Sequence, residues 1–349
     1  MARRVRSVAA PAGGFRNVHV LRLGSLGDVI LALATVVALR RAYPNARLTF
    51  WVKEEYADLV RFDPAISHVR VLERDGRRLE DLLSMSAELE DADLIVDLHG
   101  NLRTRMLAFR QKSSLLRSPS FRLTRSLRVH ARWLGRPAPP TVLERHGRLL
   151  ARIGVEAAGA PRVHAGADAE AWAAAWLSMW GDGGPVVAMI PGAAHATKRW
   201  PEDHWIDLHP RLRQSGYRLL YFGLEEDRAR VPSLAARIAL DPGSRWCMER
   251  LPRVAALLSR CVTAVAGDTG LMHLAAARGL RVVAMFGSTA PELGFTPAGE
   301  GHAVLCRHEP CQPCTLHGRE HCPKGHFRCM VGLTAEQVAD EARKILAGE

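Results

Sequence analysis

The chain has 349 residues, a length that corresponds to about two domains of ordinary size. Hydrophobic residues make up 48% of it and charged residues 24%, which excludes collagen-like, disordered and low-complexity chains. The formal net charge of +12 favours an anionic partner.

The N-terminal residues predict neither a secretion signal nor a membrane anchor. Arginines occur within residues 1–15, but no apolar core of signal-peptide length follows them. We therefore expect a basic flexible tail over 1–15 and a cytoplasmic protein. The longest apolar run, residues 29–39, is too short for a membrane span of about 20 residues. In a reducing compartment the 7 cysteines are not expected to form a disulfide framework.

Basic residues are concentrated in one segment, residues 101–150. That segment holds 12 Lys and Arg residues and a single acid, Glu144, so it carries +11 by itself. Such a concentration favours binding to nucleic acid, to anionic lipid headgroups or to a phosphorylated substrate. A solvated, arginine-rich surface without a partner is the other interpretation.

The first half of the chain alternates predicted strands with helical segments. Apolar runs predict strands at 18–23, 47–52 and 93–98, and a helix is predicted over 29–43, where Pro44 ends it. Strands that alternate with helices are typical of a parallel sheet in an α/β fold.

A change of composition between residues 155 and 185 predicts a domain boundary. Trp172, Trp176 and Trp180 recur at four-residue spacing, which places three rings on one helix face, where such rings most often pack. The glycine-rich run 181–185 is typical of a linker or of the entry into a new domain.

The same alternation restarts after this boundary, so the sequence predicts two successive α/β units, over 16–180 and 185–349. The strands expected in the second unit are 186–190, 217–222, 262–266 and 281–286. Its expected helices are 203–215, 251–260, 271–278 and one that follows Thr334, whose spacing from Gln337 is that of a capping box. Ligands of open α/β sheets bind outside the carboxyl ends of the strands, so the loops there are the candidate sites.

The first candidate loop is the glycine-bearing turn 24–29, between a strand and a helix. Its spacing is neither that of a phosphate-binding Walker loop nor that of a dinucleotide fingerprint. It brings a carboxylate, Asp28, to a helix start at the open end of a strand. Asp28 is therefore predicted to be a catalytic carboxylate, a helix cap, or both.

The second candidate loop, residues 191–201, follows the first strand of the second unit. Small residues, the hydroxyl of Thr197 and the adjacent cations Lys198 and Arg199 suit it to an oxyanion such as a phosphate. An ordinary solvated loop is the alternative, because Lys-Arg pairs are common on surfaces.

The third candidate loop, residues 266–273, is the most specific. A strand end is followed by a glycine-bearing turn that contains Asp268, Thr269 and Gly270. The first-turn N–H groups and the Thr269 hydroxyl suit an anion. His273 lies about one turn into the next helix, on the same side as Thr269, so we favour a functional role for it over packing alone.

Cysteines are concentrated near the C-terminus. Cys311, Cys314, Cys322 and Cys329 have the spacing C-x2-C-x7-C-x6-C, which is compatible with four thiolates around one structural zinc. Cys306 is a further candidate ligand. Because the second pair is not a C-x2-C, reduced and partly packed thiols are the other interpretation.

Four motifs occur in order along the chain: GSLGDVILALATVVALRRAYP, DLHGNLRTR, PGAAHATKRWPEDHW and GDTGLMHLAAA. Together they resemble glycosyltransferase family 9, the lipopolysaccharide heptosyltransferase family. The tail CQPCTLHGREHCPKGHFRCM is similar to that of heptosyltransferase II-type members. The resemblance extends from about residue 16 to the C-terminus.

The resemblance implies a GT-B fold, in which two Rossmann-like domains face each other across a cleft and the final helix packs back on the first domain. It implies inverting, metal-independent transfer from a nucleotide sugar, usually ADP-heptose. Asp28 matches the general base, Glu225 a ribose-binding carboxylate, and Arg103 falls in the acceptor-side motif. The remaining donor-binding matches are Thr197 and Lys198 at the diphosphate, and Asp268, Thr269, Gly270 and His273 in the nucleotide and phosphate turn.

Such a transfer needs a base on the acceptor hydroxyl and a clamp on the diphosphate, where charge develops. The residues that match these two roles lie in different predicted domains, so we expect closure of the cleft to bring them together and to exclude water. The family's acceptor is a phosphorylated, lipid-anchored saccharide. We therefore expect segment 101–150 to help bind the enzyme to the anionic inner-membrane surface or to the acceptor's phosphate. No cofactor is required and no nucleic acid is expected, with a structural zinc as the one candidate metal.

Two other functions stay open from the sequence. A family 9 enzyme could use another nucleotide sugar or acceptor, because pocket shape sets the sugar. A non-catalytic nucleic-acid-binding protein would account for the basic segment and the cysteines, but the chain has no recognisable recognition module. A nicotinamide oxidoreductase is disfavoured because the dinucleotide fingerprint is absent.

Overall fold

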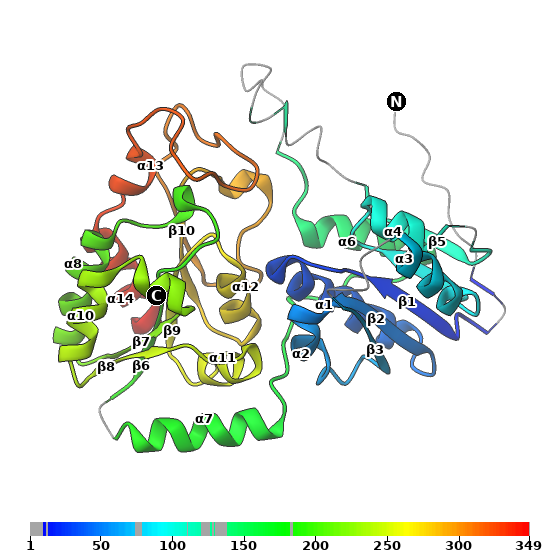
Figure 1. The fold of residues 1–349 in the computed structure, drawn as a ribbon, viewed down its shortest axis with the longest axis horizontal. Helices are drawn as coiled ribbons and strands as arrows, with labels where there is room; N and C mark the ends of the chain where they lie inside the picture. Colours follow the sequence, from blue (N-terminus) through cyan, green and yellow to red (C-terminus); the bar gives the residue numbers. More distant parts are fainter. Residues whose placement is uncertain are drawn as a thin grey trace. The chain divides into compact units, whose positions relative to one another are not determined.

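The computed structural model describes residues 10–11, 13–73, 79–109, 111–119, 126–127, 129, 138–181 and 184–348. The chain divides into two compact units (Figure 1). The first comprises the described residues up to 119 and Thr141–His164, and the second comprises those from Ala165 onward with the described residues of 126–140. Within the described part, no helix is long and apolar enough to cross a membrane.

The first unit is built on a five-stranded parallel sheet with the strand order β3-β2-β1-β4-β5. Its strands are β1 (Asn17–Leu21), β2 (Arg47–Lys53), β3 (His68–Leu72), β4 (Leu94–Asp97) and β5 (Ser114–Arg117). Its main helices are α1 (Leu26–Ala42), α3 (Leu79–Ser86), α4 (Leu102–Leu107) and α6 (Val142–Leu150). The three strands predicted from apolar runs are the three in the middle of the sheet, where both faces are covered.

The expected tail over 1–15 ends earlier than predicted. Phe15 is 3% exposed and packs edge-on against Tyr43, with the ring centroids 5.4 Å apart. A buried aromatic ring anchors the chain at this point, directly before β1. Residues 1–9 and 12 of the expected tail lie outside the described residues.

The second unit is built on a six-stranded parallel sheet with the strand order β11-β10-β9-β6-β7-β8. Its strands are β6 (Val186–Ile190), β7 (Arg218–Phe222), β8 (Ser244–Cys247), β9 (Thr263–Gly267), β10 (Val282–Phe286) and β11 (Ala303–Cys306). Its helices are α7 (Ala167–Met179), α8 (Glu202–Gln214), α9 (Glu225–Ala229), α10 (Pro232–Leu240), α11 (Leu251–Leu258), α12 (Gly270–Ala277), α13 (Arg328–Val331) and α14 (Ala335–Ala347). The GT-B class of two parallel α/β units is thereby confirmed.

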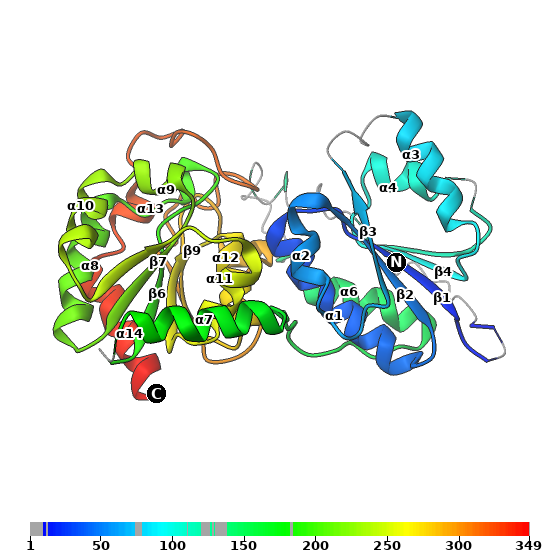
Figure 2. The ribbon, with the colours of Figure 1, turned by 60° about the horizontal axis from the view of Figure 1, so that its bottom comes forward.

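The boundary between the units lies at residues 164–165, not at the predicted 180–185. Helix α7 lies beside α11 in the second unit (Figure 2). Tryptophans in α7 and at its C-cap explain why the helix belongs to the second unit. The guanidinium of Arg253, on α11, lies 4.5 Å from the ring centroid of Trp172, and that of Arg218, on β7, lies 4.9 Å from the ring centroid of the C-cap residue Trp180. Cations over aromatic faces stabilise such a contact. The prediction that the tryptophans serve packing is confirmed.

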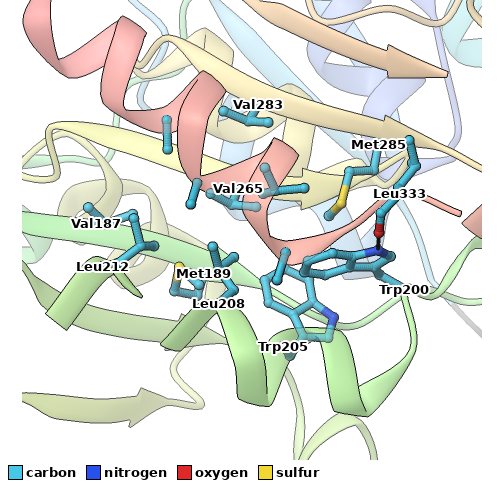
Figure 3. Close-up of a cluster of buried hydrophobic side chains, with 14 of the residues drawn as sticks. Val187, Met189, Trp200, Trp205, Leu208, Leu212, Val265, Val283, Met285 and Leu333 are labelled. Atoms are coloured by element: carbon cyan, nitrogen blue, oxygen red, sulfur yellow. Dashed lines mark hydrogen bonds between the residues drawn. The ribbon is translucent and has the colours of Figure 1, made fainter. Parts of the chain in front are cut away.

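The final helix, α14, buries its apolar face in its own unit, whereas the resemblance implied packing on the first domain. Val338, Ala339 and Ala342 belong to one core cluster with Trp200 and Trp205. Figure 3 shows this cluster, in which the Trp200 indole N–H donates to the carbonyl oxygen of Leu333 at 2.8 Å. The predicted capping box before α14 is present, with hydrogen bonds of 3.0 and 3.3 Å between Thr334 and Gln337.

Each sheet has one place where the strand order reverses. In the first sheet it lies between β1 and β4, and in the second sheet between β6 and β9. In open α/β sheets, ligands bind outside the carboxyl ends of the strands at such a switch point. Four segments follow these strands. They contain Asp28 after β1, residues 98–101 after β4, Lys198 after β6 and Asp268 after β9. The topology therefore selects three of the loops singled out from the sequence.

Candidate active site

Asp28 lies in the first turn of α1, at the carboxyl end of β1. Its carboxylate forms an ion pair with the Arg22 guanidinium, and the Ser25 hydroxyl donates to its Oδ2 at 3.1 Å. Ser25, not Asp28, occupies the N-cap position of the helix. The Asp28 side chain is 21% exposed, so a substrate hydroxyl can reach it.

A second carboxylate, Asp97, ends the neighbouring strand β4 and has a structural role. It is fully buried, and its Oδ1 accepts the N–H groups of His99 at 3.1 Å and Gly100 at 2.8 Å. Its Oδ2 accepts the Nε–H of Arg117 at 2.7 Å. These contacts fix the turn after β4 and shield Asp97 from substrate. Of the two carboxylates, Asp28 is therefore the better candidate for a base.

Two imidazoles close to Asp28 are neutral at pH 7. Burial lowers the pKa of His99 to about 4 and that of His146 to about 3, and the charge of Arg22 acts in the same direction on both. The Nδ1 of His146 lies 3.2 Å from the Thr35 hydroxyl, which joins α6 to α1. Neither imidazole adds positive charge beside Asp28, and both are weak bases.

Arg103, the predicted acceptor-side residue, lies in the first turn of α4. The helix starts at Asn101, whose side-chain oxygen accepts the N–H of Thr104 at 3.0 Å. Arg103 is half-buried, and it forms no hydrogen bond or ion pair with another described residue. Because α4 follows β4, Arg103 lies at the same sheet edge as Asp28. Its acceptor role stays a prediction.

In the second unit, Lys198 and Asp268 bring two of the predicted loops together. Nζ of Lys198 lies 2.7 Å from Oδ2 of Asp268, and the two side chains are 15% and 8% exposed. The Thr289 hydroxyl donates to the same Oδ2 at 2.7 Å. At Gly267 a Cβ atom would lie 2.8 Å from the carbonyl oxygen of Lys198, so this close approach requires glycine. Lys198 is thus held at the switch point by a carboxylate.

Thr197 is 3% exposed, and its hydroxyl is used inside the protein. Its Oγ1 lies 2.8 Å from Oγ of Ser288 and accepts the N–H of Arg319 at 2.8 Å. Its own N–H donates to the Arg319 carbonyl oxygen at 3.0 Å. These contacts tie the turn before Lys198 to the cysteine-rich segment. The observed role of Thr197 is to shape that turn, and its contact with a diphosphate stays a prediction.

The loop after β9 has the turn-to-helix geometry that the sequence predicted. Thr269 is the N-cap of α12, and its hydroxyl accepts the N–H of Met272 at 3.3 Å. Gly270 is the first residue of the helix, and His273 is 5% exposed in its first turns. A helix start of this kind suits an anion, because its N–H groups and dipole point outward. Contacts of these residues with a nucleotide stay predictions.

Glu225, the predicted ribose-binding residue, is the first residue of α9 and follows β7. Its side chain is 69% exposed and lies 3.6 Å from the Arg228 guanidinium. Because β7 neighbours β6, Glu225 lies at the same sheet edge as Lys198. This placement is compatible with a nucleotide contact, which stays a prediction.

The cysteines of the C-terminal segment are free thiols. Burial, and next the charges of Cys314, Cys311 and Cys322, raise the pKa of Cys329 to about 12. The four predicted zinc ligands therefore lie near one another. In the part of the chain that the structure describes, no group of three or more His, Cys, Asp or Glu side chains is arranged to hold a metal ion. The structural zinc stays a prediction.

Three polar residues that contact the candidate site residues were missed from the sequence. Ser288 and Thr289 follow β10 and contact Thr197 and Asp268 respectively. Arg22 directly follows β1 and pairs with Asp28. A charged residue inside the apolar run 18–23 was the available indication for Arg22. Nothing comparable marked the other two, because their partners lie far away in the sequence.

Known proteins share both the sequence pattern and the fold. The family model described as glycosyltransferase family 9 (heptosyltransferase) matches residues 83–323. Lipopolysaccharide heptosyltransferase 1 of Pseudomonas aeruginosa is 29% identical over 341 residues, which cover 92% of each chain. The crystal structure of a family 9 glycosyl transferase from Veillonella parvula covers 96% of this chain and 98% of its own, with a TM-score of 0.78 and 21% identity. Escherichia coli ADP-heptose lps heptosyltransferase II covers 95% of this chain and 99% of its own, with a TM-score of 0.73 and 17% identity.

Proposed function

We propose a reaction on the premise that this chain belongs to glycosyltransferase family 9 and is a glycosyltransferase. The reaction is transfer of a heptose from ADP-heptose to a saccharide of the lipopolysaccharide inner core, with inversion at the anomeric carbon. The names of the relatives support the sugar and the acceptor class. One observation carries the assignment to residues: each unit presents a different chemical group at its own switch point, a partly exposed carboxylate in one and a partly exposed lysine in the other.

In this proposal Asp28 is the general base. Its carboxylate is held by Arg22 and Ser25 and remains within reach of a substrate. It accepts the proton of the acceptor hydroxyl as that oxygen attacks the anomeric carbon. Arg103, at the same sheet edge, binds the acceptor, whose phosphate groups suit a guanidinium fork.

The donor is bound by the second unit. Lys198 and the start of α12, at Thr269 and Gly270, neutralise the diphosphate, while Asp268 keeps the lysine in position. His273 and Thr197 support this turn, and Glu225 binds the ribose. As the new glycosidic bond forms, the bond from the anomeric carbon to the diphosphate breaks, and ADP leaves with the electron pair. The cations of the protein supply the charge stabilisation, so no metal ion takes part in the step.

We also propose that the enzyme works on the anionic cytoplasmic surface of the inner membrane. Within the basic segment, Leu102 is 74% exposed and Phe109 62% exposed. Arg105 and Lys112, in the same stretch, are exposed cations. Exposed apolar side chains beside cations are suited to a membrane surface that carries negative headgroups. The other arginines of 110–136, apart from Arg117, lie outside the described residues.

A donor panel tests the proposal. The enzyme is incubated with a deacylated inner-core acceptor and, in separate reactions, with ADP-heptose, UDP-glucose or GDP-mannose. We expect acceptor-dependent release of ADP and negligible release of UDP or GDP. Release of another nucleoside diphosphate at a higher rate would assign the chain a different nucleotide sugar.

A further inference from the structure

Arg22 is a largely buried cation outside the sequence motifs, and the proposed function uses it only as a contact of Asp28. It follows β1, and its side chain is 14% exposed. A guanidinium is rarely buried without partners that compensate its charge. Arg22 has two such partners: the carboxylate of Asp28, and the carbonyl oxygen of Leu98, to which its Nη1 donates at 2.6 Å.

These two partners lie in different loops at one edge of the sheet. Strands β1 and β4 are parallel neighbours, with Leu21 opposite Asp97. The loop after β1 carries Asp28, whereas the loop after β4 runs from Leu98 into α4, on which Arg103 lies. Arg22 therefore connects the proposed base to the element that carries the proposed acceptor-binding residue.

The connection is rigid for a physical reason. A guanidinium is planar and presents its N–H groups in a fixed fork, so two simultaneous partners define its orientation. Its charge also favours the ionised form of a carboxylate in direct contact. The other titratable and charged groups in this neighbourhood are His99, His146, Asp97, Lys53 and Arg145. The two imidazoles are neutral at pH 7, and Asp97 is engaged by Arg117.

We propose that Arg22 is a positioning residue for the acceptor half of the reaction: it orients the Asp28 carboxylate, keeps it ionised, and fixes its distance from the turn that leads into α4. This inference rests on the proposed function, in which Asp28 is the base. Arg22 acts through Asp28 and takes no proton itself.

Two variants separate the orienting effect from the effect of charge. Arg22→Met removes both, so we expect kcat to fall by about 100-fold, the usual cost of a small misplacement of a catalytic group. The acidic limb of its rate–pH profile should move to higher pH, because the cation no longer favours the ionised carboxylate. Arg22→Lys keeps the charge but not the fork, so its acidic limb should stay near that of the wild type while kcat recovers only in part.

The matched control is Arg61→Met, which removes an exposed cation of the same unit that pairs with Asp58. It should leave kcat and the pH profile unchanged. ADP affinity should be unchanged in every variant, because ADP binds the other unit, and circular dichroism with thermal unfolding shows whether each variant folds. If Arg22→Met fails to fold, Arg22→Lys decides: reduced kcat with wild-type thermal unfolding supports the proposal, and wild-type kcat overturns it.

The outcome for Asp28 separates this inference from the proposed function. If Asp28→Asn abolishes turnover while Arg22→Met has wild-type kcat and an unchanged pH profile, the role of Arg22 is wrong and the base assignment stands. If Asp28→Asn retains turnover, the base assignment fails, and the role of Arg22 fails with it.

Discussion

Lys198 and Asp268 form a largely buried ion pair across the switch point of the second sheet, with 2.7 Å between Nζ and Oδ2. The lysine follows β6 and the carboxylate follows β9, so the pair joins two loops that are distant in the sequence but adjacent at the sheet edge. Asp268 also accepts the Thr289 hydroxyl. Both Lys198 and Thr289 therefore contact the same carboxylate oxygen, and Asp268 fixes the position of the lysine ammonium group.

The first prediction concerns Lys198 and the donor diphosphate. Lys198→Met should weaken ADP binding by about 10- to 100-fold, because a hydrogen bond to a charged group contributes about 1.5–3 kcal/mol. AMP binding should change much less, since AMP lacks the β-phosphate. Calorimetry with the two nucleotides measures the difference, and Arg211→Met, an exposed cation of the same unit, is the control. Equal losses for ADP and AMP would show that Lys198 does not hold the β-phosphate.

The second prediction concerns the base. Asp28→Asn should lower turnover by about 10²–10⁴-fold, the range that general base catalysis contributes. Donor affinity should change little, because the donor is bound by the other unit. Asp58→Asn, a change at a surface carboxylate of the same unit, should retain full turnover. Steady-state kinetics with the natural acceptor measures turnover. A near-normal rate for Asp28→Asn would show that Asp28 is not the general base.

The third prediction concerns the membrane surface. Binding to liposomes should require anionic lipid and should fade as salt rises, because surface attraction is screened over about 8 Å at physiological ionic strength. Arg105→Gln combined with Lys112→Gln, two exposed cations of the basic segment, should weaken binding further. Co-sedimentation with neutral and anionic vesicles measures this. Equal binding to both kinds of vesicle would contradict electrostatic binding to the membrane surface.

The fourth prediction concerns stability at acid pH. The unfolded chain protonates His146 near its ordinary pKa of 6.5, whereas burial lowers the folded-state pKa to about 3. The unfolded state therefore binds more protons between these values, so the free energy of unfolding falls as pH drops from 6.5 towards 3 and is unaffected above that window. His146→Gln should flatten this dependence, whereas His68→Gln, at an exposed position of the same unit, should keep it. Denaturation at pH 7 and pH 5 compares the slopes; a wild-type slope in His146→Gln would show that this histidine is not the source.

The fifth prediction concerns metal. Treatment with a chelator should leave turnover unchanged, because the protein's own cations stabilise the leaving diphosphate. If the proposed structural zinc is present, chelation should release it near stoichiometrically and should make Cys311, Cys314, Cys322 and Cys329 reactive towards an alkylating reagent. Elemental analysis and thiol alkylation follow the metal separately from activity. Loss of turnover that added metal restores would contradict a metal-independent transfer.

Much of the architecture could be predicted because the central strands are continuous apolar runs. The segments at β1, β2, β4, β6, β7, β9 and β10 were all identified, whereas the edge strands β3, β5, β8 and β11 were not. Edge strands are covered less completely, so their sequences mix polar with apolar residues; HVRVL at β3 is an example. The domain boundary was misplaced because glycine composition suggested a linker at 181–185, while the Trp–Arg contacts of α7 decide its true position.

The candidate site could be predicted only as far as its loops. Asp28, Lys198 and Asp268 stand at strand ends with recognisable neighbours, so the sequence identified them. Thr289, the partner of Asp268, could not be assigned, because a hydrogen bond between distant loops depends on strand order. Arg22 lies close to Asp28 in the sequence, and its charge inside the apolar run 18–23 was the available indication of their ion pair. The sequence also could not show that Thr197 is buried, since its hydroxyl is used by Arg319 and Ser288 from the far end of the chain.

The central claim is that the two switch points serve one transfer, with Asp28 acting on the acceptor and Lys198 on the leaving ADP. Mass spectrometry and NMR of the product formed from ADP-heptose and an inner-core acceptor test it most directly. We expect an acceptor that has gained one heptose with the anomeric configuration inverted relative to the donor, and one ADP for each heptose transferred. A product with retained configuration, or ADP release without a heptosylated acceptor, would contradict it.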